Sequence, residues 1–289
     1  VDNVEISPTV IKAAPIFSSE NNNVLDNPKS RIINDDGRSY LAVTDKKYDI
    51  ITEEPMHPSL AGVINLYTRE YYELVKAHLK QGGIMSQWIP LYNLSVEDVR
   101  MLSATFTSVF PHTSIWIANT DIFLIGSNER LVIDYDRVIE RLSSPEIKRL
   151  LADIDLEDPE EFLSTFLMNE RMARAFSEGA DIITDNMPIV EFTGPKSLAL
   201  NTISPNIARL ISFREPITGF LKFKDPKTGH DVSARLQKKS YAVRENLIGR
   251  AYYADGNFPK AVEYFDRSLA IDPTDRNSLH YKSKHRFLK

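Results

Sequence analysis

The sequence contains no cysteine among its 289 residues, which excludes disulfide bonds, thiolate metal ligands and cysteine nucleophiles. It has no apolar run near the roughly 20 residues that cross a bilayer, and no basic-then-apolar signal pattern at its N-terminus. The formal net charge is −5, which gives no reason to expect nucleic-acid binding. We therefore predict a cytoplasmic protein with no nucleic-acid partner and no transmembrane segment in this chain.

The residues that are present favour a globular chain of more than one unit. Hydrophobic residues make up 42% and charged residues 26% of the sequence, which is enough for a full core. We predict an α/β domain over residues 1–128, a helical and irregular extension over 129–241, and a helical repeat over 242–289. The densest basic run, Lys238 to Arg250, is predicted to be a solvated helix face.

The first 128 residues alternate short apolar runs with amphipathic ones, which is typical of a mainly parallel sheet wrapped by helices. Strands are expected at 1–6, 31–34, 48–52, 84–91, 113–118 and 121–125, and helices at 10–17, 38–43, 66–80 and 95–110. The helix at 66–80 should end at Gly82-Gly83. The last two strands should form an antiparallel edge of the sheet.

The first part of the extension at 129–241 has clear helix-start signals, and the later part does not. Ser144-Pro145 and Asp158-Pro159 each pair a capping side chain with a proline at the first helical position. They predict helices over 145–152 and 159–167, followed by a third near 169–178. Residues 182–231 are rich in proline, glycine and asparagine, so an irregular connection is expected there.

The C-terminal part has the spacing of a tetratricopeptide repeat over residues 242–275. The matching residues are Gly249, Tyr252, Ala261, Phe265 and Pro273. The last 14 residues begin another first helix. Because one repeat cannot bury its own faces, it must dock on the preceding domain, on further repeats or on a partner. A plain helical hairpin and a peptide-binding groove both remain open.

Acidic side chains follow three of the predicted strands. They are Glu5, Asp35-Asp36 with Gly37, and Glu53-Glu54. Successive strand ends of a doubly wound sheet open on one crevice, so these carboxylates could converge. They could bind ribose hydroxyls, an adenine amino group and an amine nucleophile, although each could equally be a cap or turn residue.

Residues 1 to about 200 contain a series of spaced motifs: VEISP at 4–8, DDG at 35–37, YDII at 48–51 followed by acids, LY at 66–67, YY at 71–72, GG at 82–83 and QW at 87–88. They resemble those of spermidine synthases, the polyamine aminopropyltransferases, which have the Rossmann-like fold of class I S-adenosylmethionine-dependent methyltransferases. Three longer segments, at 58–72, 87–92 and 184–192, are more similar to the spermidine-synthase-like domains of bacterial proteins that carry a transporter-like membrane region upstream. That similarity implies a membrane region upstream in the full-length protein.

The resemblance implies a role for each matching residue. Glu5, Asp35 and Asp36 with Gly37 would bind decarboxylated S-adenosylmethionine, or S-adenosylmethionine itself. Glu54 would be the catalytic base that deprotonates the attacking amine. The substrate amine would be lined by Gln87, Tyr67 and His57. The implied reaction needs no metal, and the chain could form a homo-oligomer.

Two departures from the family pattern affect these expectations. Spermidine synthases have D-[ST]-x-D-P where this chain has Glu54-Pro55-Met56-His57-Pro58, so an amine-binding acid is replaced by His57. His57 could be a general base or a structural residue. In addition, no glycine precedes Gly37, so the glycine-rich loop and the first strand of the fold are expected to be missing. The strands at 1–6 and 48–52 would then have unpaired edges.

Three functions remain open from the sequence. The first is aminopropyl transfer to an amine that has diverged from putrescine. The second is an inactive scaffold whose repeat binds a protein or peptide, and the third is a methyltransferase that uses the same pocket.

Overall fold

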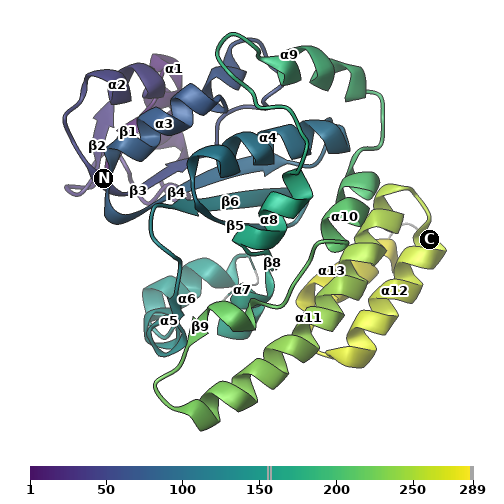
Figure 1. The fold of residues 1–289 in the computed structure, drawn as a ribbon. Coiled ribbons are helices and arrows are strands. Elements are labelled where there is room, and N and C mark those ends of the chain that lie inside the picture. Colours follow the sequence, from purple (N-terminus) through teal and green to yellow (C-terminus); the bar gives the residue numbers. More distant parts are fainter. Residues whose placement is uncertain (155, 157, 287–289) are drawn as a thin grey trace.

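The computed structural model describes residues 1–154, 156 and 158–286. Its strands are β1 (Asp2–Val4), β2 (Arg31–Ile33), β3 (Tyr48–Glu53), β4 (Leu79–Pro90), β5 (His112–Ala118), β6 (Asp121–Ser127), β7 (Ile133–Asp134), β8 (Phe166–Met168) and β9 (Leu221–Lys222). They form a five-stranded sheet of order β3-β4-β6-β5-β8 and the two-stranded sheets β1-β2 and β7-β9. Figure 1 shows these strands with helices packed around them and with α10 to α13 to one side. The predicted α/β class with an all-α C-terminal part is confirmed, but the expected mainly parallel sheet is not. In the five-stranded sheet only β3 and β4 pair in parallel, and the other three pairs are antiparallel.

The helices follow the capping signals closely in the first half of the chain. The α-helices are α1 (Pro8–Ala13), α2 (Gly37–Val43), α3 (Arg69–His78), α4 (Val96–Val109), α5 (Tyr135–Leu142), α6 (Pro145–Ala152), α7 (Pro159–Ser164), α8 (Glu170–Ser177), α9 (Ile189–Thr193), α10 (Ile203–Ile211), α11 (Pro226–Ala254), α12 (Phe258–Ile271) and α13 (Arg276–Arg286), and the 3-10 helices are η1 (Ala14–Phe17), η2 (Val63–Leu66), η3 (Gly194–Ser197) and η4 (Ile217–Phe220). Ser95 caps α4 through a reciprocal capping box with Asp98. Against the sheet, α3 and α4 meet through Tyr72 and Phe106, whose ring centroids are 5.1 Å apart.

Four local predictions were wrong. The helix predicted at 66–80 ends at His78, and Gly82-Gly83 lie inside β4. A Cβ at Gly83 would stand 3.1 Å from the Tyr48 carbonyl oxygen, so this glycine permits close strand approach and does not cap a helix.

The second and third errors concern strand β8 and the stretch at 182–231. Strand β8, three apolar residues long, pairs with β5 and takes the sheet edge that was predicted for the β5–β6 hairpin. It lies where the helix at 159–167 was predicted to end. The stretch at 182–231 contains α9, α10 and the start of α11, because proline is compatible with helix starts as well as with loops.

Strands β1 and β3 each pair on one side only within the described residues. Strand β1 pairs in parallel with β2, and β3 pairs in parallel with β4. The unpaired edges predicted for these two strands are therefore present. Asp2 links the two sheets, because its Oδ2 accepts from the hydroxyls of Tyr40 and Tyr48 at 3.0 and 2.9 Å. Burial alone would raise the pKa of Asp2, but the bonds from Lys46 and the tyrosines outweigh it and lower the pKa to about 2.

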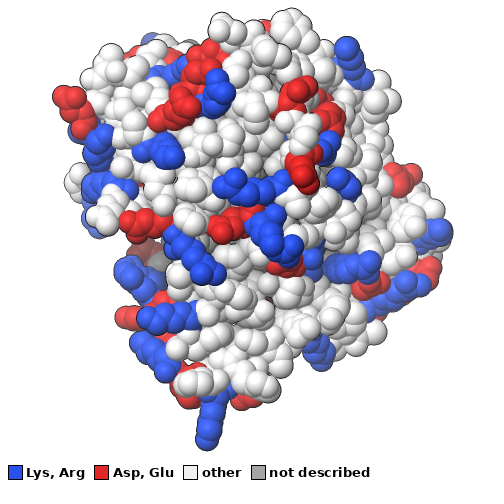
Figure 2. Space-filling view, in the orientation of Figure 1, with Lys and Arg blue, Asp and Glu red and all other residues white. Residues whose placement is uncertain are grey.

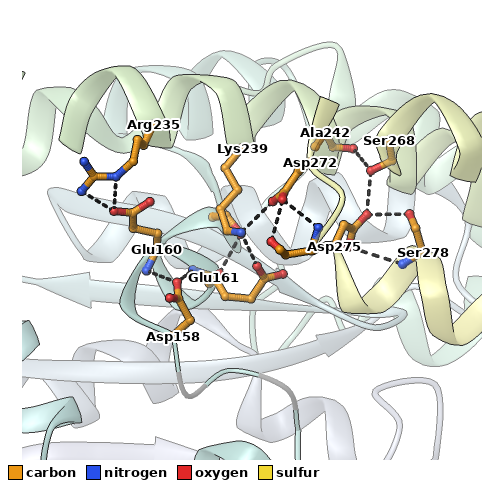
Figure 3. Close-up of polar contacts among 12 residues, drawn as sticks. Asp158, Glu160, Glu161, Arg235, Lys239, Ala242, Ser268, Asp272, Asp275 and Ser278 are labelled. Carbon is orange, nitrogen blue, oxygen red and sulfur yellow. Dashed lines mark hydrogen bonds and ion pairs between the residues drawn. The ribbon is translucent and has the colours of Figure 1, made fainter. Parts of the chain in front are cut away.

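The repeat docks on the chain that precedes it. Helices α11 and α12 form the predicted hairpin, in which a Cβ at Gly249 would come within 2.6 Å of the Phe265 ring. Helix α11 also packs against α7 and α10. Figure 3 shows Lys239 of α11 between Glu161 of α7 and Asp272, which follows α12, with both N···O distances at 2.7 Å. The prediction of a solvated face for this basic run is the fourth error, since Lys239 points into the interface.

Candidate functional site

The C-terminal ends of β3 and β4 place a carboxyl and an amide side by side. Glu53 is aligned with Gln87 in the parallel register, so both side chains project from the same face of the sheet. Gln87 is fully buried. Within the described chain, Gln87 Oε1 and Glu53 Oε2 are both enclosed without a hydrogen-bond partner. Tyr67, also fully buried, lies beside both and donates to the Trp88 carbonyl at 3.3 Å. We call Glu53, Gln87 and Tyr67 the β3–β4 polar cluster.

The electrostatics of this cluster favour an uncharged Glu53. Burial raises the pKa of Glu53 to about 8, and the negative charge of Asp36 adds to the effect. Burial also raises the pKa of Tyr67, with the charge of Glu53 adding to it, and that of Tyr72, where Tyr67 and Glu53 contribute. The Glu53 carboxyl is therefore mostly protonated at neutral pH.

Glu54 faces a different group. It is exposed, and its charge contributes, after burial, to raised pKa values at Asp121 and Tyr92. Asp121 is paired with Pro90 where β4 ends, and its Oδ1 is another enclosed oxygen without a partner among the described residues. The predicted base thus lies near a second carboxylate that the sequence did not identify.

His57 uses both ring nitrogens within the protein. Nδ1 lies 2.7 Å from Ser59 Oγ, and Nε2 lies 3.0 Å from the Tyr92 carbonyl oxygen. Since a carbonyl oxygen only accepts, Nε2 carries a hydrogen and donates it. No ring nitrogen is left for the amine contact that the family pattern assigns to this position, and the geometry favours the structural interpretation of His57.

The acids predicted to bind the nucleoside hold nearby backbone amides. Glu5 Oε1 accepts from Ser7 N at 2.7 Å. Asp35 Oδ1 accepts from the amide of Asp36 at 2.8 Å. Asp36 Oδ1 accepts from Ser39 N at 2.8 Å and so caps α2. Each of these carboxylates uses one oxygen in this way, which leaves the other available to a ligand.

Of these acids, Asp36 is the one that the structure brings to the β3–β4 polar cluster. Its charge acts on Glu53 across the space between the two sheets. A Cβ added at Gly37 would meet nothing within 4 Å, so there is room beside Asp36. Glu5 lies at the end of β1, in the other sheet, where its amide donates to the Ile33 carbonyl.

The segment at 184–192 is hydrogen-bonded to α2 and to the N-cap of α3. Asp185 receives two bonds from Arg38, at 2.9 and 2.6 Å, and one from the hydroxyl of Thr68 at 2.7 Å. The hydrogen bond from Arg38 holds the pKa of Asp185 below its ordinary value. Further along, Glu191 accepts from Gly62 N at 3.1 Å. This motif therefore fixes the elements around Tyr67.

Sequence reasoning missed Tyr92 and Asp121 as members of the site, and it placed Glu53 among the strand-end acids without giving it a role. A signal for Glu53 existed, because side chains alternate along a strand and Glu53 and Glu54 must point in different directions. Tyr92 lies in the QW-x-P-L-Y motif at 87–92. For Asp121 we find no signal, since its position depends on the pairing of β6 with β4.

The described residues show no feature of a metal site or of a membrane span. Within residues 1–154, 156 and 158–286, no group of three or more His, Cys, Asp or Glu side chains could hold a metal ion. The helices in this part of the chain are too short or too polar to cross a membrane. Figure 2 shows Lys and Arg interspersed with Asp and Glu over the face displayed.

Comparison with known families identifies two parts of the chain. Residues 1–131 match the family model described as the spermine/spermidine synthase domain. This part of the chain is similar to that domain, and we call it the spermidine-synthase-like domain. Residues 246–275 match the tetratricopeptide repeat model, at the place where α11 and α12 form their hairpin.

Relatives of the spermidine-synthase-like domain include named polyamine aminopropyltransferases. The protein of Methanocaldococcus jannaschii is 34% identical over 118 residues, which cover 39% of this chain and 40% of that one. The protein of Sulfurisphaera tokodaii is 25% identical over 196 residues, covering 64% and 63%. The chain thus spans between two fifths and two thirds of the length of these relatives. A solved structure, a probable spermidine synthase from Corynebacterium glutamicum, aligns with a TM-score of 0.47 and 18% identity over 64% of this chain and 63% of that one.

Proposed function

We propose that the spermidine-synthase-like domain transfers an aminopropyl group from decarboxylated S-adenosylmethionine to an amine. The observation that carries this proposal is the convergence of Asp36, the β3–β4 polar cluster, Glu54 and Asp121 at the C-terminal ends of β3 and β4, where β6 begins. Open α/β sheets bind their ligands at that end. The polyamine aminopropyltransferases among its relatives support the choice of reaction.

In the proposed step, the lone pair of a primary amine attacks the aminopropyl carbon that is bonded to the sulfonium. A C–N bond forms and the C–S bond breaks, so its electron pair stays on sulfur and methylthioadenosine leaves as a neutral thioether. Glu54 accepts the proton that the amine loses. Asp36 with Gly37, Asp35 and Glu5 hold the nucleoside, and Gln87 and Tyr67 orient the amine. The negative charges of Asp36 and Glu54 would also raise the local concentration of a polycationic acceptor.

Replacing Glu54 by glutamine tests the assignment of the base. We expect the rate of amine transfer to fall about a hundredfold, since general-base catalysis is typically worth 10²–10⁴, while methylthioadenosine binding is unchanged. Product mass should be measured with decarboxylated S-adenosylmethionine and a panel of amines. Glu73→Gln is the matched control, because Glu73 is an exposed residue of α3.

The same assay separates the competing functions. Methylated products from S-adenosylmethionine would identify a methyltransferase instead. If the wild-type protein transfers neither group to any amine, the proposal fails and the inactive scaffold is supported.

Replacing Asp36 by asparagine tests the nucleoside site without removing the α2 cap, because asparagine caps helices as well as aspartate does. We expect methylthioadenosine to bind about tenfold more weakly, since one charge-assisted hydrogen bond is lost. Calorimetry measures the affinity, and circular dichroism confirms that the variant is folded. Unchanged affinity would remove Asp36 from the site.

A further inference from the structure

The β3–β4 polar cluster contains enclosed oxygen atoms that no group of the described residues satisfies. Glu53 Oε2 and Gln87 Oε1 are enclosed and have no partner in the part of the chain that the structure describes. The nearby Tyr67 hydroxyl already donates to a main-chain carbonyl. Enclosed acceptors without partners are rare in proteins, so the cluster is built for a donor that comes from outside.

The position of the cluster limits what that donor can be. Glu54 directly follows β3, and the charges of both Glu53 and Glu54 add to the raised pKa of Tyr67, so a ligand at the cluster would lie near the proposed base. Glu53 as a residue keeps partial solvent contact, and β3 is the terminal strand of its sheet. The exposed part of Glu53 gives a ligand access to the cluster from solvent. An ammonium group matches the acceptors best, because it has three donors and no acceptor.

The family pattern places an acid at His57 for the amine, and here that residue is fully engaged by Ser59 and Tyr92. We propose that Glu53, with Gln87, binds the ammonium group at the non-reacting end of a diamine acceptor, in place of the acid that His57 replaces. This inference rests on the proposed function and adds a specificity-determining residue to it. Glu53 binds substrate and positions it, whereas Glu54 takes the proton.

Binding through Glu53 has a consequence for protons. In the free protein the carboxyl is mostly protonated near neutral pH, because of burial and the charge of Asp36. The other titratable groups that face it are Tyr67 and Tyr72, which stay neutral in this range. An ammonium ion stabilises the carboxylate, so binding should release close to one proton at pH 7 and should be tighter at higher pH.

Calorimetry with 1,3-diaminopropane, 1,4-diaminobutane and 1,5-diaminopentane, in the presence of saturating methylthioadenosine, tests the inference. For at least one diamine, we expect wild-type affinity to rise roughly twentyfold between pH 6.5 and 8.5, as linkage to a group of pKa about 8 requires. The binding enthalpy should depend on the ionisation enthalpy of the buffer. Glu53→Gln should bind at least about tenfold more weakly at pH 8.5, with no pH dependence and no proton release.

Two further variants make the result specific. Gln87→Met removes the other acceptor, so it should weaken diamine binding but keep the pH dependence. Glu73→Gln, the exposed control on α3, should behave as wild type in every respect.

The inference and the proposed function can fail separately. Equal affinity and equal pH dependence in wild type and Glu53→Gln would overturn the inference and leave aminopropyl transfer standing. Binding of methylthioadenosine without binding of any diamine would also overturn it. If neither methylthioadenosine nor a diamine binds, the proposed function falls with it.

Discussion

Replacing Lys239 by methionine is expected to lower the free energy of unfolding by about 3–5 kcal/mol, the usual cost of breaking a buried ion pair from one side. Lys239 lies between Glu161 and Asp272 (Figure 3), and the three side chains are only 13%, 9% and 15% exposed. Burial alone would lower the pKa of Lys239, but its bonds to the two carboxylates outweigh burial and raise it. Methionine fills the space and leaves two carboxylates facing each other without a cation.

The pH dependence of this loss gives a second readout. In the variant the two buried carboxylates should prefer to be protonated, so their pKa values rise above those of the unfolded chain. Because the folded variant binds these protons more tightly than the unfolded chain, its free energy of unfolding falls as pH rises. The destabilisation caused by Lys239→Met should therefore be larger at pH 8 than at pH 5. Chemical denaturation at both values measures it.

The sequence offers a matched control next to this residue. Lys238 is exposed, so Lys238→Met should change stability by less than about 0.5 kcal/mol. Adding Glu161→Gln and Asp272→Asn to Lys239→Met should recover part of the loss, because no unpaired charge remains. Equal losses for Lys238→Met and Lys239→Met would show that the network does not stabilise the interface.

Replacing Glu53 by glutamine is expected to stabilise the protein at pH 8.5 by about 3 kcal/mol and to change little at pH 4.5. The folded pKa is raised to about 8 from an ordinary 4.5, so between these values the folded state holds more protons than the unfolded state. The contribution of the Glu53 carboxyl to stability is therefore fully present below about pH 4.5 and is lost as pH rises toward 8. The full difference is worth roughly 5 kcal/mol, and the partial solvent contact of the residue reduces it.

Urea denaturation of wild type and Glu53→Gln across this pH range checks the expectation. The two stability curves should separate as pH rises and run parallel above about pH 8.5. Glu73→Gln supplies the control for a change of surface charge. A constant offset between the curves would mean that the Glu53 carboxyl titrates in the folded protein as it does in the unfolded chain.

The first half of the fold could be predicted because its signals are local. Capping residues and apolar runs predicted β3 and helices α2 and α4 within a few residues. Strand β8 could not be predicted, since three apolar residues have no period and their pairing with β5 is long-range. Helix α5 was also missed, although Tyr135, Val138, Ile139 and Leu142 form an apolar stripe at helical spacing.

The candidate site was predictable in outline and not in its contacts. Strand order predicted that acids would gather at the ends of β2 and β3, and Asp36 and Glu53 do lie near each other. Which acid of the pair Glu53-Glu54 is enclosed depends on the packing of Tyr67, and the sequence does not contain that information. The buried cation Lys239 was missed for a similar reason: its partners come from α7 and from the residue after α12.

Helix α11 joins the repeat to the helices that precede it, so the two parts cannot be separated at the predicted domain boundary. It runs without interruption from Pro226 to Ala254, and the boundary predicted at 241/242 falls near its middle. Its first half packs on α7 and its second half is the first helix of the repeat. The repeat is therefore not a transplantable module, because a cut at that boundary would divide one rod of about 43 Å and leave two incomplete cores.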